Sequence, residues 1–233
     1  MAEPLPMLLV PGLNCSARLY GAQIPILWRF GPVTVADHTR DDAMAAIARR
    51  ILANAPPRFA VVGLSMGGYL ALELLRQASD RVAKVALLDT AARADTPEQS
   101  ARRDRLMELA RGGRFAEVVD ALLPLFLHTD RQDDEELKFL VRLMADETGP
   151  EAFIRQQTAL KARADYRDAL SSIHCPALVL VGEGDTLTPP ERSEEIAAAI
   201  PGARLVVVPE CGHLSTIERP EAVNRALIEW MEG

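Results

Sequence analysis

Short runs of apolar and β-branched residues alternate along the chain with segments of helical periodicity. Continuous apolar runs are typical of strands that are buried on both faces of a sheet. They predict strands over Met7–Val10, Val33–Ala36, Phe59–Gly63, Val82–Asp89, Ala177–Val181 and Arg204–Val208. The helical patterns predict helices over Asp41–Asn54, Met66–Ala78, Pro190–Ala199 and Pro220–Met231. Strands separated by helices form βαβ units, so the chain is predicted to be an α/β protein with a doubly wound, mostly parallel sheet of about six strands.

Residues 92–169 interrupt this alternation because they contain no convincing strand pattern. They predict about four helices, separated by glycine-containing turns, over Glu98–Arg111, Phe115–Leu127, Asp134–Glu147 and Pro150–Ala164. We therefore expect a helical insertion over 92–169 between the fourth and fifth strands, within a core made of residues 1–91 and 170–233.

The composition narrows the possible partners. The 233 residues include 26 basic and 33 acidic side chains, and a net charge of −7 argues against binding to nucleic acid or to anionic membranes. No apolar run approaches the ~18 residues of a membrane span, and the N-terminus does not have the basic start of a signal peptide. The three cysteines fit neither a disulfide framework nor a metal site. We expect a cytoplasmic protein without metal or cofactor, and nothing in the sequence indicates its oligomeric state.

A candidate nucleophile follows the third predicted strand. Gly63-Leu64-Ser65-Met66-Gly67 has the G-x-S-x-G form and opens a predicted helix, which is the context of a nucleophile elbow. In that turn Gly63 and Gly67 leave space for the backbone, and Ser65 projects at the carboxyl edge of the sheet, where open α/β sheets bind ligands. The alternative is a tight turn that carries an exposed serine without a function.

A serine hydroxyl needs a general base, and the chain has four histidines. His213 follows the sixth predicted strand and is the preferred candidate. His38 follows the second strand and could reach the same edge of the sheet, so it remains an alternative. His128 and His174 have the positions of surface or structural residues.

The base needs an acid that fixes its tautomer and stabilises its charged form. Asp185 lies just past the fifth strand, and the order Ser65, Asp185, His213 is that of α/β-hydrolases. Asp89 ends the fourth strand and is an alternative, as is Glu183. Each could also simply cap a strand end.

Acyl transfer further requires donors for an oxyanion. The backbone N–H of Met66, after the nucleophile, is one candidate, and that of Leu13, in the loop after the first strand, is the other. Asn14 is the alternative to Leu13. Cys15 and Cys211 flank the two loops and are interpreted as small filling residues, because neither lies in an elbow.

These motifs together resemble the α/β-hydrolase superfamily over nearly the whole chain. The resemblance rests on Pro11-Gly-Leu, Gly63-Leu-Ser-Met-Gly-Gly68, Gly182-Glu-Gly-Asp185 and Gly212-His-Leu with Glu218-Arg-Pro220 downstream. The stretch from Leu178 to Trp230 is similar to the small-esterase and enol-lactonase branch. Within this resemblance, the antiparallel strands that usually precede the first strand are expected to be missing, and the insertion is expected to cap Ser65 and to line an apolar acyl pocket.

The resemblance implies a serine hydrolase that cleaves a small carboxylic ester or lactone through an acyl-enzyme intermediate. The same three side chains are compatible with C–C bond hydrolysis, acyl transfer or perhydrolysis, because fold and triad alone do not separate these reactions. A non-catalytic protein that binds a small ligand under the cap is a further alternative. Reactions with an aspartate nucleophile are disfavoured because position 65 is serine.

Overall fold

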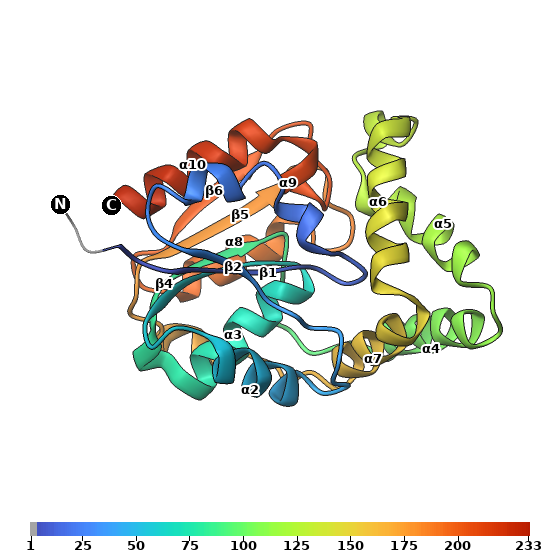
Figure 1. Cartoon of the computed structure of the whole chain (residues 1–233), viewed down its shortest axis with the longest axis horizontal. Coiled ribbons are helices and arrows are strands. Elements are labelled where there is room, and N and C mark those ends of the chain that lie inside the picture. The colour runs from blue at the N-terminus through green and yellow to red at the C-terminus, as the bar shows by residue number, and fades with distance from the viewer. Residues whose placement is uncertain (1–3) are drawn as a thin grey trace.

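Six parallel strands form one sheet in the computed structural model, which describes residues 4–233 (Figure 1). The strands are β1 (Met7–Val10), β2 (Val33–Val35), β3 (Phe59–Leu64), β4 (Val82–Leu88), β5 (Ala177–Gly182) and β6 (Arg204–Val208). Their order across the sheet is β2-β1-β3-β4-β5-β6, and each neighbouring pair is parallel. The predicted strands are confirmed to within one residue at each end, and no antiparallel strand occurs among the described residues.

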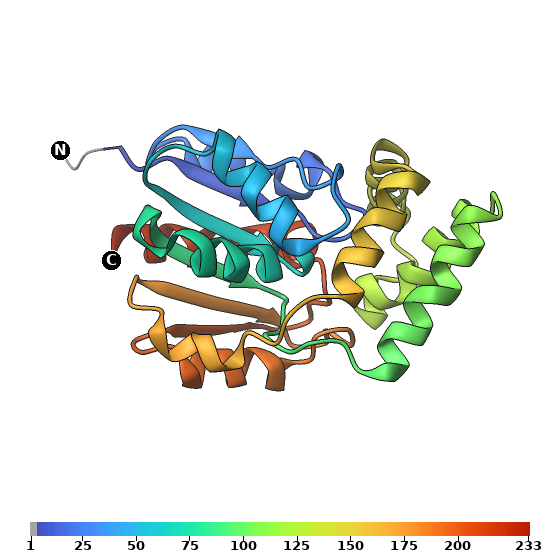
Figure 2. The same ribbon diagram turned by 90° about the horizontal axis from the view of Figure 1, so that it is seen from below.

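Helices cover both faces of this sheet (Figures 1 and 2). Leu8 and Val10 of β1 pack with α2 (Met44–Asn54), α3 (Met66–Ala78) and α8 (Pro190–Ala199) on one face. Met7 and Leu9 point the other way, because successive side chains of a strand alternate between faces. That second face packs against the short helices η1 (Ala17–Tyr20) and α1 (Ile24–Leu27) and against α10 (Pro220–Glu232). The predicted doubly wound architecture is therefore confirmed.

Four helices are inserted between β4 and β5, and we call them the inserted helices. They are α4 (Pro97–Arg111), α5 (Phe115–Phe126), α6 (Glu135–Thr148) and α7 (Pro150–Lys161), close to the predicted ranges. Local signals begin and end two of them: Thr96 and Gln99 form a capping box at the start of α4, Asp134 caps the start of α6, and Gly149 ends α6 with a φ of 78°. Short helices η2 (Ser79–Arg81), η3 (Thr129–Arg131), η4 (Arg167–Ser172) and α9 (Ser215–Glu218) complete the chain.

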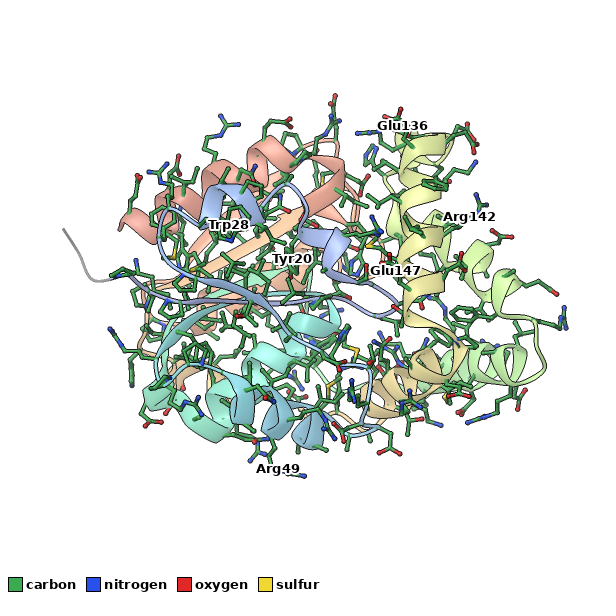
Figure 3. All side chains as sticks on the ribbon, viewed as in Figure 1. Tyr20, Trp28, Arg49, Glu136, Arg142 and Glu147 are labelled. Atoms are coloured by element: carbon green, nitrogen blue, oxygen red, sulfur yellow. The ribbon has the colours of Figure 1, made fainter. Side chains whose placement is uncertain are left out.

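The inserted helices lie beyond the carboxyl ends of the strands (Figure 2). Their apolar faces are continuous with the core, since Phe126, Val141 and Phe153 belong to the same buried cluster as Leu9. Glu147 lies on the side of α6 that faces η1 (Figure 3) and accepts hydrogen bonds from the Ser16 hydroxyl and the Arg18 guanidinium, each at 2.6 Å. None of the helices described is both long and apolar enough to cross a membrane.

Candidate active site

The turn between β3 and α3 holds Ser65 in a strained conformation, with φ 55° and ψ −113°. Two glycines allow the turn to pack closely against the rest of the sheet. A Cβ atom on Gly63 would lie 2.1 Å from the carbonyl oxygen of Gly67, and one on Gly67 would lie 1.9 Å from that of Val10. The strain and these contacts explain why a G-x-S-x-G sequence is needed here.

Three side chains from three separate loops meet above this turn. His213 follows β6, and its Nε2 atom lies 2.8 Å from the Oγ atom of Ser65. Its Nδ1 atom lies 2.7 Å from Oδ2 of Asp185, which follows β5. His213 and Asp185 are buried, whereas Ser65 is half-buried and reaches the cavity described below. The structure thus brings together the three residues that the sequence nominates as nucleophile, base and acid.

The surroundings of Asp185 keep its carboxylate ionised. Burial by itself would raise the pKa of Asp185, but His213 and the donors of Thr188 outweigh it and hold this pKa below its ordinary value. The Thr188 hydroxyl donates to Oδ2 at 2.7 Å, and the backbone N–H groups of Leu187 and Thr188 donate to Oδ1 at 2.8 and 3.0 Å. Burial would conversely lower the pKa of His213, yet the nearby carboxylates, Asp185 first, raise it above its ordinary value of 6.5.

The alternative residues lie elsewhere or have other partners. Asp89 accepts hydrogen bonds from the Gly182 N–H at 2.9 Å and from the Ser215 hydroxyl, and burial raises its pKa well above the ordinary value. His38 lies 2.9 Å from the carbonyl oxygen of Gly12 and 3.1 Å from Gln156, not against Ser65. Glu183 is exposed. Asp185 is therefore the carboxylate that contacts His213.

Leu13 and Met66 carry the two backbone N–H groups that the sequence nominates as oxyanion donors. Met66 begins α3, where the first N–H groups of a helix have no internal partner. Leu13 lines the cavity beside Ser65, and neither N–H has an acceptor among residues 4–233. The N–H of Asn14 instead donates to Gln156 at 3.0 Å, so of the two candidates in this loop only Leu13 keeps an N–H without an acceptor among the residues described.

The two cysteines near these loops are buried and protonated. Burial raises the pKa of Cys15 to about 12 and also raises that of Cys211. Neither thiol is therefore suited to act as a nucleophile, because the thiolate is the reactive form.

The inserted helices hold the loop that carries His213, a feature that sequence analysis missed. The carbonyl oxygen of Phe126 at the end of α5 accepts hydrogen bonds from the N–H groups of His213 and Leu214, at 3.1 and 3.2 Å. The buried Glu218 carboxylate bridges the N–H groups of Gly212 and His128, at 3.0 and 2.9 Å. In the sequence, Glu218-Arg-Pro220 contributed only to the family resemblance. The contact between Glu218 and the His128 N–H depends on the fold and could not be predicted.

A cavity of about 230 Å³ opens above Ser65 and His213. Its remaining lining comes mostly from α4, α5, α7 and the loop after β5: Leu13, Tyr69, Gln99, Arg102, Arg103, Leu106, Leu122, Phe126, Gln157, Leu160, Arg163, Thr186, Leu187 and Thr188. The prediction of an apolar wall is wrong in part, because three arginines share the lining with the leucines. The apolar residues of the insertion are evident from the sequence, but the side of each helix that faces Ser65 could not be predicted from it.

No metal site accompanies the cavity in the part of the chain that the structure describes, since no three His, Cys, Asp or Glu side chains are grouped as metal ligands require.

Comparison with known sequences identifies the family of this chain. Residues 8–226 match the sequence family described as Alpha/beta hydrolase family. The chain belongs to the alpha/beta hydrolase family.

Three similar proteins each align with more than nine-tenths of this alpha/beta hydrolase. A thermophilic esterase from Thermogutta terrifontis is 31% identical, with a TM-score of 0.90 over 99% of this chain and 90% of that one. An enol-lactonase from Burkholderia xenovorans LB400 is 26% identical, with a TM-score of 0.87 over 100% and 93% of the two chains. A pimeloyl-[acyl-carrier protein] methyl ester esterase from Neisseria meningitidis serogroup B is 29% identical over 91% and 85% of the two chains. This alpha/beta hydrolase is a hydrolytic enzyme.

Proposed function

We propose that this alpha/beta hydrolase cleaves a small carboxylic ester or lactone with Ser65 as nucleophile, His213 as base and Asp185 as the acid that orients the base. The observation that carries the proposal is the continuous chain of contacts from Ser65 Oγ through both ring nitrogens of His213 to Asp185. The esterase and lactonase activities named for similar proteins support the substrate class.

The proposed reaction uses each contact in turn. His213 Nε2 accepts the proton of the Ser65 hydroxyl while Oγ attacks the carbonyl carbon, and Asp185 stabilises the imidazolium that forms. The N–H groups of Leu13 and Met66 donate to the oxyanion, helped by the positive end of the α3 dipole. The tetrahedral intermediate then expels the alcohol, which takes the proton from His213. Water activated by His213 hydrolyses the acyl-enzyme in the reverse sense.

We also propose that residues 92–169 act as a cap over the core formed by residues 1–91 and 170–233. Side chains from α4, α5 and α7 line the same cavity as Ser65, which supports this division. The cavity is smaller than the roughly 300–1,000 Å³ of common ligand pockets, which favours a short substrate.

Wild-type protein is expected to hydrolyse p-nitrophenyl acetate and butyrate, and a fluorophosphonate probe is expected to label Ser65. Release of p-nitrophenolate and mass spectrometry of the labelled tryptic peptide measure the two results. Absence of both turnover and labelling would count decisively against a serine hydrolase.

The rate of ester hydrolysis is expected to fall on acidification, with a midpoint above pH 6.5. The base must be neutral, and the raised pKa of His213 means that protonation already inactivates it at higher pH than for an ordinary histidine. Asp185, whose pKa is lowered, stays ionised throughout this range. A profile of kcat/KM for an uncharged ester from pH 5 to 9 tests this, and a flat profile between pH 5 and 8 would exclude His213 as the base.

A further inference from the structure

The cavity above Ser65 is lined by three basic side chains, Arg102, Arg103 and Arg163, and within the described part of the chain no acidic side chain lines it. This gathering of positive charge does not reflect the composition, because the protein carries 33 acidic against 26 basic residues. A cavity lined by one sign of charge concentrates ligands of the opposite sign.

Two of the three arginines already have partners within the protein. Arg163 is buried, pairs with Asp95, donates to the carbonyl oxygens of Arg93 and Leu160, and lies with its guanidinium 4.3 Å from the centre of the Tyr69 ring. Arg103 binds the same Asp95 carboxylate through Nε, at 2.7 Å, and through Nη2. One carboxylate is therefore shared by two guanidinium groups, and these two arginines join α4 to the segments just before and just after the inserted helices.

Arg102 differs from both. It is half-buried in the cavity wall, and among residues 4–233 neither a hydrogen-bond acceptor nor an acidic partner contacts its guanidinium. Burial, together with the charges of Arg103 and Arg105, lowers its pKa from the ordinary value, so its charged form is under-stabilised. A partly desolvated guanidinium with unused donors gains from a planar anion, which can accept two parallel hydrogen bonds.

We propose that Arg102 binds a carboxylate carried by the substrate, so that the preferred substrate is a small ester or lactone that also bears a free carboxylate. This inference rests on the proposed function, because Ser65 would attack the other end of the same molecule. The small volume supports it: Arg102 and Ser65 line one cavity of about 230 Å³, so a short molecule can contact both. Arg102 is then a specificity residue of the active site.

The test compares charged and neutral substrates of equal size. The monoethyl esters of succinic, glutaric and adipic acid carry a carboxylate, and the corresponding ester amides replace it with an uncharged group of similar shape. We define the acid-to-amide ratio as kcat/KM for a monoethyl ester acid divided by kcat/KM for its ester amide. We expect Arg102→Gln to lower this ratio by roughly 10- to 100-fold, mainly through KM, because a hydrogen-bonded charge is lost from the bound state. Arg105→Gln is the matched control, since Arg105 is exposed on the same helix and does not line the cavity; its ratio should equal that of wild type.

An Arg102→Gln ratio equal to the wild-type ratio, for all three chain lengths, would overturn the proposal. Failure of the proposed function is recognised separately, as the absence of hydrolysis of every acid, amide and p-nitrophenyl ester. In that case calorimetric titration with glutarate still decides about Arg102. Binding to wild type that is lost in Arg102→Gln supports the carboxylate site, and equal binding or no binding to the two proteins refutes it.

Discussion

Replacement of Ser65 by alanine is expected to lower kcat for a short p-nitrophenyl ester by roughly 10⁶-fold, the scale seen when a triad nucleophile is removed from a serine hydrolase. Without Oγ the proposed acyl-enzyme cannot form, and only binding and the proposed oxyanion donors remain. The backbone conformation should persist, because the close contacts of the turn are made by Gly63 and Gly67 and not by the serine hydroxyl. Stopped assays at high enzyme concentration, over several hours, measure the residual rate.

Ser171→Ala provides the matched control for this loss. Ser171 is an exposed serine of η4 that does not line the cavity above Ser65, and its removal should leave kcat and KM unchanged. Turnover by Ser65→Ala within tenfold of wild type would show that another residue is the nucleophile. Unchanged circular dichroism and an unchanged unfolding midpoint establish that the variant is folded.

The framework of the site could be predicted because it depends on local sequence. Buried parallel strands are continuous apolar runs, so each strand end could be located, and the residues of interest follow directly after strands. Ser65, Asp185 and His213 all lie at the carboxyl edge of the sheet for this reason. Order along the chain then suggested their roles.

Chain order favoured Asp185 over Asp89, but the contacts that separate these chemically equivalent candidates could not be predicted. Asp89 and Asp185 both follow strands, and only the packed structure shows that the first is bound by Gly182 and Ser215 while the second contacts His213. The difference lies in tertiary contacts between segments that are far apart in the sequence.

The composition of the cavity wall also depends on tertiary contacts. Arg102 and Arg103 are neighbours on α4, yet Arg103 pairs with Asp95 and Arg102 has no such partner among the residues described. The link between Phe126 and the His213 loop likewise joins segments that are almost ninety positions apart. Helical periodicity predicts that α4 and α5 exist but does not orient them relative to Ser65.

Gly67→Ala is expected to destabilise the protein by at least about 3 kcal/mol, because the added methyl group would meet backbone that cannot move aside. The Cβ atom would lie 1.9 Å from the carbonyl oxygen of Val10 and 2.9 Å from that of Pro11. Val10 is fixed on both sides: β1 pairs with β3 through Gly63, and the buried Tyr20 hydroxyl donates to the Val10 carbonyl oxygen at 2.8 Å. Urea unfolding, followed by circular dichroism, measures the loss as a lower midpoint.

Gly112→Ala is the control for the general effect of removing a glycine. Gly112 has an ordinary φ of −78°, and a Cβ atom there would approach no atom closer than 3.4 Å, so its free energy of unfolding should change by less than about 1 kcal/mol. A Gly67→Ala protein with the wild-type midpoint would show that α3 does not pack this closely on β1. Any folded fraction of Gly67→Ala should also lose kcat, because relief of the clash between Gly67 and the Val10–Pro11 backbone shifts Ser65 relative to the Leu13 N–H, the proposed oxyanion donor. The stability of the turn and the proposed position of the oxyanion donor therefore both depend on the lack of a side chain at Gly67.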